Sequence, residues 1–189
     1  MGKSWLSVVL LLVAACHSTG AEDSQPTKAP LAQKQAPEPV TATMLTFLDT
    51  KGARWAGVHF KIQKGWHIYG KVSGDSGLPT RVSWQLPTGA SASAVHYPPA
   101  ERFTDTGDIV TYGYTTETLL LSEITLGKST LEPVQIAAKV KWLACQASQC
   151  VPGEANLSQP LLRQPAPDGQ LTALFERFKP GPAIESPEH

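Results

Sequence analysis

Apolar and polar residues alternate with a period of two through much of the chain after about residue 41. The two clearest examples place every second residue on one apolar face: Ala56, Val58, Phe60 and Ile62 in the first, and Val134, Ile136, Ala138, Val140 and Trp142 in the second. Such alternation is typical of β-strands with one buried face. Shorter apolar runs, bounded by Gly, Pro, Asp and Ser, occupy residues 44–48, 82–86, 94–97, 109–114, 118–124 and 156–162. This spacing predicts an all-β sandwich over residues 41–165.

A helical pattern follows near the C-terminus. Leu171, Leu174, Phe175 and Phe178 share one face of a helix that Asp168 is positioned to cap. Because a short helix needs burial for stability, we expect it to pack on the edge of the sandwich, with docking to a partner as the alternative. Residues 166–189 are therefore predicted to hold a short helix and, from about residue 180, a disordered tail.

The first 15 residues have the layout of a secretory signal peptide. Lys3 precedes an apolar run, Trp5 to Ala15, that is too short for a comfortable membrane span. The sequence Val13-Ala14-Ala15-Cys16 resembles the bacterial lipobox, whose cysteine becomes diacylated. Cleavage nearby without lipidation is the alternative. We expect a periplasmic protein anchored at Cys16, in the outer membrane because His17, and not Asp, follows the cysteine.

Residues 16–40 have a different composition from the segments on either side. They are rich in Ala, Pro, Gln, Ser and Lys and show no apolar periodicity. This composition predicts a flexible, semi-extended linker that lets the folded domain stand away from the membrane.

The charge balance argues against nucleic acid as a partner. The chain has 16 Lys and Arg against 16 Asp and Glu, so it offers no excess of positive charge to neutralise phosphates. Motifs of serine hydrolases, zinc proteases and phosphate-binding loops are also absent from the sequence.

The remaining chemistry lies in two cysteines. If Cys16 carries lipid, Cys145 and Cys150 are the pair left, in a compartment where disulfides persist. A strand-like run ends at these residues, and Pro152-Gly153 is expected to close the turn. No Lys, Arg or His lies between them, so nothing adjacent marks either thiol as strongly acidified. This favours a relay with selective partners.

Two other interpretations of the pair stay open. A purely structural disulfide across so short a loop stabilises by only roughly 2 kcal/mol. A metal site, for copper or zinc, needs further ligands, and the available His59, His67 and His96 are scattered through the sequence. We therefore expect neither a bound metal nor a cofactor, with a partner- or copper-binding lipoprotein module as the alternative function.

Several ordered motifs precede the cysteines: Gly65-Trp66-His67-Ile68-Tyr69, Gly77-Leu78-Pro79-Thr80, Tyr97-Pro98-Pro99 and Tyr112-Gly113-Tyr114. Together with Trp142-Leu143-Ala144-Cys145 and Cys150-Val151-Pro152-Gly153, they resemble the N-terminal periplasmic domain of the thiol:disulfide interchange protein DsbD, especially its ScsB-like relatives. The resemblance covers residues 41–162 and implies an immunoglobulin-like fold.

The resemblance also implies roles for individual residues. Cys145 and Cys150 correspond to the redox pair, with Cys150 attacking an incoming disulfide and Cys145 resolving the mixed disulfide. The segment Trp66 to Tyr69 corresponds to an aromatic wall beside the site, where His67 is positioned to tune the thiols. Phe103, within residues 101–104, corresponds to a cap loop that shields the sulfurs.

The partners implied are periplasmic thioredoxin-like proteins and disulfide isomerases, supplied with electrons by a membrane-embedded donor. The sequence shows no bundle of transmembrane helices and no C-terminal thioredoxin-like Cys-x-x-Cys motif, so we expect the donor to be a separate protein, with loss of the reductase role as the alternative. The cysteine spacing is also one residue shorter than in the best-known DsbD domain.

Overall fold

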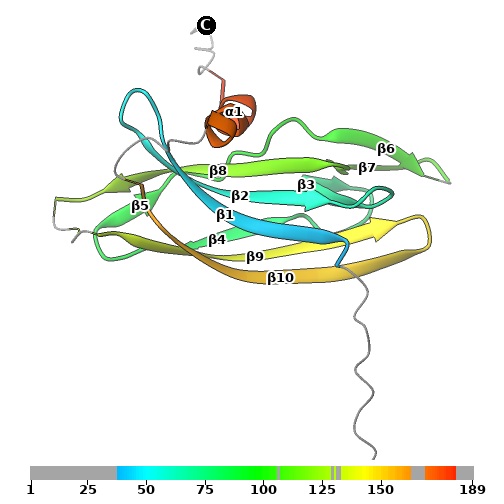
Figure 1. Cartoon of the computed structure of the whole chain (residues 1–189). Helices are drawn as coiled ribbons and strands as arrows, with labels where there is room; N and C mark the ends of the chain where they lie inside the picture. Colours follow the sequence, from blue (N-terminus) through cyan, green and yellow to red (C-terminus); the bar gives the residue numbers. More distant parts are fainter. Residues whose placement is uncertain (1–37, 106, 129, 131–132, 163–168, 182–189) are drawn as a thin grey trace, which may run out of the picture. The chain divides into compact units, whose positions relative to one another are not determined.

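The fold consists of two antiparallel β-sheets and one helix. It is seen in a computed structural model that describes residues 38–105, 107–128, 130, 133–162 and 169–181. The first sheet has the strand order β1-β2-β8-β5 (Figure 1). Its members are β1 (Val40–Leu48), β2 (Arg54–Ile62), β8 (Glu117–Leu126) and β5 (Ala90–Ala92).

The second sheet has the order β10-β9-β3-β7-β6, and β4 also pairs with β9. Its members are β10 (Gln149–Pro160), β9 (Gln135–Gln146), β3 (His67–Gly74), β7 (Ile109–Tyr114), β6 (Glu101–Asp105) and β4 (Arg81–Gln85). Two strands pair with the same side of β9. β3 pairs with Ala144 and Cys145, and β4 pairs with residues 137–141.

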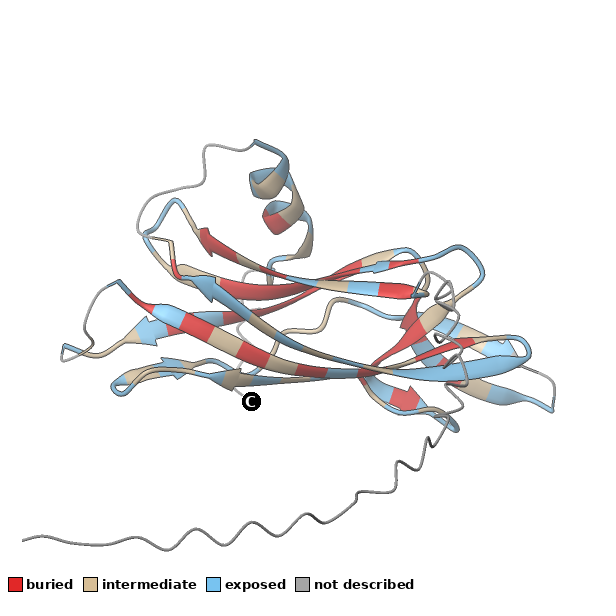
Figure 2. Ribbon diagram, turned by 60° about the horizontal axis from the view of Figure 1, so that its bottom comes forward, coloured by how far each residue is buried: buried red, intermediate tan, exposed pale blue. Residues whose placement is uncertain are grey.

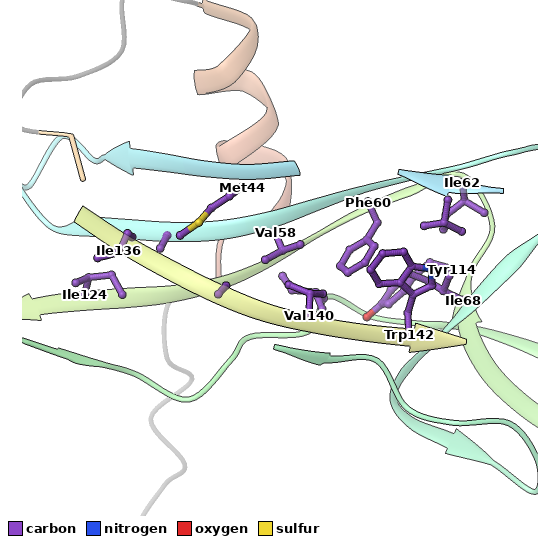
Figure 3. Packing of buried hydrophobic residues seen from close by; sticks show 14 of the residues in the cluster. Met44, Val58, Phe60, Ile62, Ile68, Tyr114, Ile124, Ile136, Val140 and Trp142 are labelled. Carbon is purple, nitrogen blue, oxygen red and sulfur yellow. The ribbon is translucent and has the colours of Figure 1, made fainter. Parts of the chain in front are cut away.

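The core lies between the two sheets, where their apolar faces meet (Figure 3). Phe60 from the first sheet packs edge-on against Trp142 from the second, with ring centroids 5.6 Å apart. The buried residues alternate with more exposed ones along β9, as the period-two pattern requires (Figure 2). This arrangement confirms the predicted all-β, immunoglobulin-like β-sandwich.

Some predicted strands are misplaced. Residues 94–97 do not form a strand: β5 ends at Ala92, and His96 makes only an isolated bridge to Leu121. The apolar alternation of residues 94–97 instead reflects side chains of Val95 and Tyr97 that pack against the core from a connecting segment. The predicted final strand also begins earlier, at Gln149.

The hairpin that carries the cysteines turns at Ala147 and Ser148, so the prediction that Pro152-Gly153 closes the turn is wrong. Both of these residues lie within β10, where Pro152 pairs with Leu143. In a two-residue hairpin the pair next to the loop is hydrogen-bonded and the pairs then alternate. Pro152 therefore occupies a position whose backbone faces away from β9, as does Pro160, and neither proline removes a hydrogen bond from the β9–β10 ladder.

The predicted C-terminal helix is present as α1 (Gly169–Phe178). It lies on the outer face of the first sheet, not on the sandwich edge (Figure 1). Phe175 stacks on Phe47 at 5.1 Å and contacts Trp55 at 5.7 Å between ring centroids. Leu119 and Leu121 complete this second apolar cluster. Both faces of β8 are therefore covered, which explains why its residues from Thr118 to Ser122 are all buried.

An ion-pair network links α1 to the sheet beneath it. Glu117 accepts hydrogen bonds from Arg177 of α1 and, at 2.8 Å, from the ring Nε2 of His59 in β2. The Arg177 guanidinium holds the pKa of the Glu117 carboxyl below its usual value; burial opposes this shift, and the hydrogen bond from His59 adds a smaller lowering effect.

Among the described residues, no helix has the length and apolar character needed to cross a bilayer. The predicted signal peptide, Cys16, the linker up to residue 37 and the cap residue Asp168 lie outside the described residues, as does the tail after Gly181.

Replacing Phe60 by alanine should lower the free energy of unfolding by roughly 3–5 kcal/mol, because its fully buried ring leaves a cavity against Trp142. Urea unfolding at neutral pH measures the change. Val72→Ala is the control: Val72 is 65% exposed, and its loss should cost less than about 0.5 kcal/mol. Equal effects of the two substitutions would contradict the described core.

Replacing Glu117 by glutamine should remove a stabilisation that depends on pH. Because the folded-state pKa lies below the unfolded one, this stabilisation is complete above roughly pH 4.3 and is lost as the pH falls through the folded value. The difference in unfolding free energy between the wild type and Glu117→Gln should therefore shrink on acidification, as measured by urea unfolding over a pH series. Glu123→Gln, an exposed carboxylate on the same strand, is the control; a pH-independent difference for Glu117→Gln contradicts the ion-pair network.

Candidate functional site

Cys145 of β9 and Cys150 of β10 form a disulfide across the hairpin. The two residues face each other in the register, with Cα atoms 4.1 Å apart. They occupy a pair without mutual backbone hydrogen bonds, where facing side chains lie closest together. Because Trp142 and Ala144 are buried in the core, Cys145 between them and the turn points to the outer face of the second sheet.

The two sulfurs differ in their access to solvent. Cys145 lies inside the sheet, paired with Cys150 on one side and with His67 of β3 on the other, and it is only 2% exposed. Cys150 lies on the edge strand β10 and is exposed. A thiol or disulfide arriving from solvent therefore reaches the sulfur of Cys150 first.

Three of the predicted site residues gather over the buried sulfur. Tyr69 is 5% exposed, and its hydroxyl donates a hydrogen bond to Cys145 Sγ at 3.4 Å. The His67 ring lies 5.1 Å from the Tyr69 ring and 5.2 Å from the Phe103 ring, between centroids. These contacts bring β3 and the distant strand β6 together at the disulfide.

The resemblance implied that Phe103 lies in a loop, but the structure places it in a strand. Residues 101–104 belong to β6, which pairs with β7 and aligns Phe103 with Thr111. The sequence Glu-Arg-Phe-Thr lacks an apolar alternation strong enough to predict a strand. Backbone pairing with β7 at the sheet edge provides the missing stabilisation.

Trp66 has a different environment from the other three aromatic residues. It precedes β3, and its side chain packs against the main core cluster. Its backbone N–H donates to the Gln63 carbonyl at 3.0 Å, in the turn that leads from β2 into β3. Its described contacts are therefore those of a core residue at the start of the strand that carries His67 and Tyr69.

A set of residues around Tyr69 was not identified as part of the site from the sequence. Thr80 donates its hydroxyl to the Tyr69 carbonyl at 2.6 Å, and Tyr97 donates to the Thr80 carbonyl at 2.9 Å. Gly77 lies directly against the Tyr69 ring: a Cβ atom at this glycine would come within 2.1 Å of Tyr69 Cζ. The signal was present in the motifs Gly77-Leu78-Pro79-Thr80 and Tyr97-Pro98-Pro99, but spacing alone does not tell which ring they support.

Burial changes the pKa of two supporting tyrosines. It raises the pKa of Tyr97, and it raises the pKa of Tyr114, whose hydroxyl donates to the Pro98 carbonyl at 2.8 Å, to about 12. Both phenols, which are protonated at neutral pH even at their usual pKa, donate hydrogen bonds to backbone carbonyls. In the described part of the chain, no three His, Cys, Asp or Glu side chains are grouped as a metal site.

An immunoglobulin-like sandwich with one accessible and one buried sulfur, beneath aromatic side chains, defines a thiol–disulfide exchange module. The chain belongs to the family described as thiol:disulfide interchange protein DsbD, N-terminal, whose sequence profile matches residues 32–162. The match ends before α1.

Two solved structures match this chain. The crystal structure of the N-terminal periplasmic domain of ScsB from Proteus mirabilis matches with a TM-score of 0.55 and 19% identity, covering 75% of this chain and 55% of that one. This chain therefore spans about half the length of that domain. The reduced DsbD N-terminal domain of Neisseria meningitidis matches with a TM-score of 0.34 and 14% identity, covering 63% of this chain and 85% of that one. A comparison with curated proteins finds no match.

Replacing Gly77 by alanine should displace the Tyr69 hydroxyl from Cys145 Sγ and so slow reduction of the disulfide by dithiothreitol, measured by thiol release, because the buried Cys145 thiolate then leaves without its hydrogen-bond donor. Gly77 has φ +84°, so the substitution also costs roughly 1–2 kcal/mol in backbone strain. Gly65→Ala supplies the matched control, because Gly65 has φ +87° with no atom within 4 Å of the added Cβ. It should lose stability without changing the reduction rate; equal rates for both variants contradict a role for the Tyr69 hydroxyl at the buried sulfur.

Proposed function

We propose that this protein carries two electrons between partner proteins in the periplasm by opening and reclosing the Cys145–Cys150 disulfide. The observation that carries the proposal is the asymmetry of the pair: Cys150 is exposed on an edge strand, while Cys145 is buried one strand further in. A bond that only braced the hairpin has no need of one accessible sulfur and one sulfur buried beside aromatic side chains.

The exchange proceeds in two displacements. In the reduced protein, the Cys150 thiolate attacks one sulfur of the partner's disulfide, forms a mixed disulfide and releases the partner's other sulfur as a thiolate. The Cys145 thiolate then attacks the Cys150 sulfur, which restores the disulfide and releases the partner's second thiolate. The partner gains two electrons and takes two protons from solvent. A donor dithiol regenerates the pair by the reverse sequence.

Tyr69 stabilises the sulfur that has no access to solvent. When a donor thiol attacks Cys150, the sulfur of Cys145 leaves as a thiolate in a buried position, where charge is costly. The Tyr69 hydroxyl already lies 3.4 Å from that sulfur and donates toward it. Hydrogen bonds to a charged acceptor are worth roughly 1.5–3 kcal/mol, so this contact supports the leaving group.

The aromatic cover limits which thiols react. His67, Tyr69 and Phe103 form one connected group of rings that adjoins the disulfide. Phe103 comes from β6, the edge strand on the far side of the sheet, so a partner that shifts β6 also loosens the ring cover beside the buried Cys145 sulfur. We assign Phe103 the role of a shield and His67 that of tuning the thiols.

The partners we propose are thioredoxin-like proteins or disulfide isomerases as acceptors, and a membrane protein as the electron donor. Family membership and the description of the ScsB domain as periplasmic support this assignment. The signal sequence and the lipobox at Cys16 support a lipid anchor, with the outer membrane as its location and residues 16–40 as a tether. On this assignment residues 41–165 are the exchange domain.

Cys145→Ser should trap partners, because the free Cys150 thiol forms mixed disulfides that no resolving thiol can release. Cells expressing this variant should yield adducts that are sensitive to reductant on nonreducing gels, with thioredoxin-like proteins among them. The matched variant Cys150→Ser retains only a buried thiol and should trap far less. Equal trapping by the two variants would overturn the assigned order of attack.

A redox titration separates exchange from a structural role. After equilibration with graded dithiothreitol, thiol trapping should give a potential above roughly −300 mV, the range below which structural disulfides lie. The double variant Cys145→Ser, Cys150→Ser should fold but lose all transfer of electrons to partners. A bond that resists every physiological reductant would contradict the proposal and favour a binding module with a structural disulfide.

A further inference from the structure

A groove adjoins the disulfide on the outer face of the second sheet. We call it the β9–β10 groove; it has a volume of about 600 Å³, and six of the residues that line it are Leu78, Pro79, Arg81, Lys141, Trp142 and Pro152. It lies beside the part of β9 where pairing with β3 ends and pairing with β4 begins. The Gly77–Thr80 segment, which supports Tyr69, is next to it.

The groove is in line with the two cysteines. Side chains two and four residues apart on a strand share one face, at about 3.3 Å per residue. Pro152 and Glu154 therefore follow Cys150 along the outer face at roughly 7 and 13 Å, and Lys141 precedes Cys145 at roughly 13 Å on the same face. An extended segment that reaches Cys150 can run along this face and place its own alternate side chains over the groove.

The part of the groove nearest the disulfide is apolar. Leu78 is 63% exposed, and Pro79 and Pro152 lie with it around the groove. Exposed apolar side chains grouped beside a site are typical of a binding surface.

The far part of the groove carries positive charge. Arg81 and Lys141 are direct partners in the β4–β9 pairing. The carboxylate that also lines the groove, Glu154, is shared between Lys141 at 3.4 Å and Lys139 at 3.0 Å, so two cations divide one negative charge. Arg81 donates to the neutral backbone carbonyl of Lys71 at 3.2 Å, a contact that does not neutralise its charge.

We propose that the β9–β10 groove docks an extended segment of the partner protein that flanks its reactive cysteine. That segment carries a bulky apolar side chain two residues from the cysteine and a carboxylate four residues from it. The inference rests on the proposed function, since it places the partner's sulfur at Cys150. It adds a chemical basis for partner choice: apolar contact with Leu78 and Pro152, and charge pairing with Arg81 and Lys141.

A binding experiment without redox chemistry tests the docking. The oxidised protein is titrated with a pentapeptide that has serine in place of the cysteine, leucine at the third position and glutamate at the fifth, and binding is followed by amide chemical shifts. A second peptide with the reversed sequence tests whether the segment binds in the opposite N-to-C direction. Replacing its glutamate by lysine should weaken binding about fivefold to tenfold, as expected for the loss of two exposed ion pairs.

Variants of the groove should remove this preference. In Arg81→Gln, Lys141→Gln the glutamate and lysine peptides should bind equally, while the control Lys51→Gln, Lys128→Gln removes two exposed cations elsewhere and should change nothing. Leu78→Ser should weaken binding of both peptides about threefold or more, by the loss of apolar contact. Val72→Ser, an equally exposed apolar residue outside the groove, should not.

A second readout separates failure of docking from failure of the proposed function. The reduced protein is reacted with the cysteine form of each peptide, presented as a mixed disulfide with a small neutral thiol, and with hydroxyethyl disulfide. Faster reaction of the glutamate peptide in either chain direction supports the inference. Equal rates for both peptides, with normal reaction of hydroxyethyl disulfide, overturn the docking inference alone. No reaction with any disulfide overturns the proposed function and the docking inference together.

Discussion

The site depends on the antiparallel register of β9 and β10. This register sets Cys145 opposite Cys150 at a position where facing side chains approach most closely, and it directs both toward the outer face of the sheet. A slip by one residue would place the two sulfurs on opposite faces, because side chains alternate along a strand. The two-residue turn at Ala147 and Ser148 and twelve consecutive pairs along the hairpin fix that register.

The position of the two strands within the sheet then makes the cysteines unequal. β9 is an inner strand, with β10 on one side and β3 and β4 on the other, whereas β10 is an edge. The buried Cys145 is covered by Tyr69, and Tyr69 is in turn held by Thr80 and Gly77, which belong to the connection between β3 and β4. The chemistry therefore sits on paired strands of a closed core, so its geometry is set by the fold and not by a free loop.

Much of this fold follows from the sequence, and the exceptions have physical causes. The alternation in residues 56–62 and 134–142 correctly predicts β2 and β9, because each buries one face against the core. The strand β3 is obscured because Tyr69 and Gly70 are buried beside Ile68, which breaks the alternation. The strand β6 shows no apolar pattern, because it is held mainly by backbone pairing to β7. The prediction of a turn at Pro152 is wrong for a related reason. Proline indicates a turn in most contexts, but it also fits an edge strand at a position whose backbone nitrogen faces away from the neighbouring strand.

The site itself was only partly predictable. The cysteine pair was identified from the sequence pattern and the aromatic residues His67, Tyr69 and Phe103 through the resemblance, and the structure brings them together. The supporting contacts from Gly77 and Thr80 depend on how a connecting segment packs across the sheet, which no local pattern encodes.

The prolines of β10 have a consequence beyond the pairing itself. An open edge strand offers a row of unpaired amides on which another chain can assemble, and it is a common starting point for amyloid-like growth. Pro152 and Pro160 interrupt that row near its two ends. The edge that exposes Cys150 to a visiting protein is thus a poor template for aggregation, so a reactive sulfur can stand at the border of a sheet without seeding fibrils.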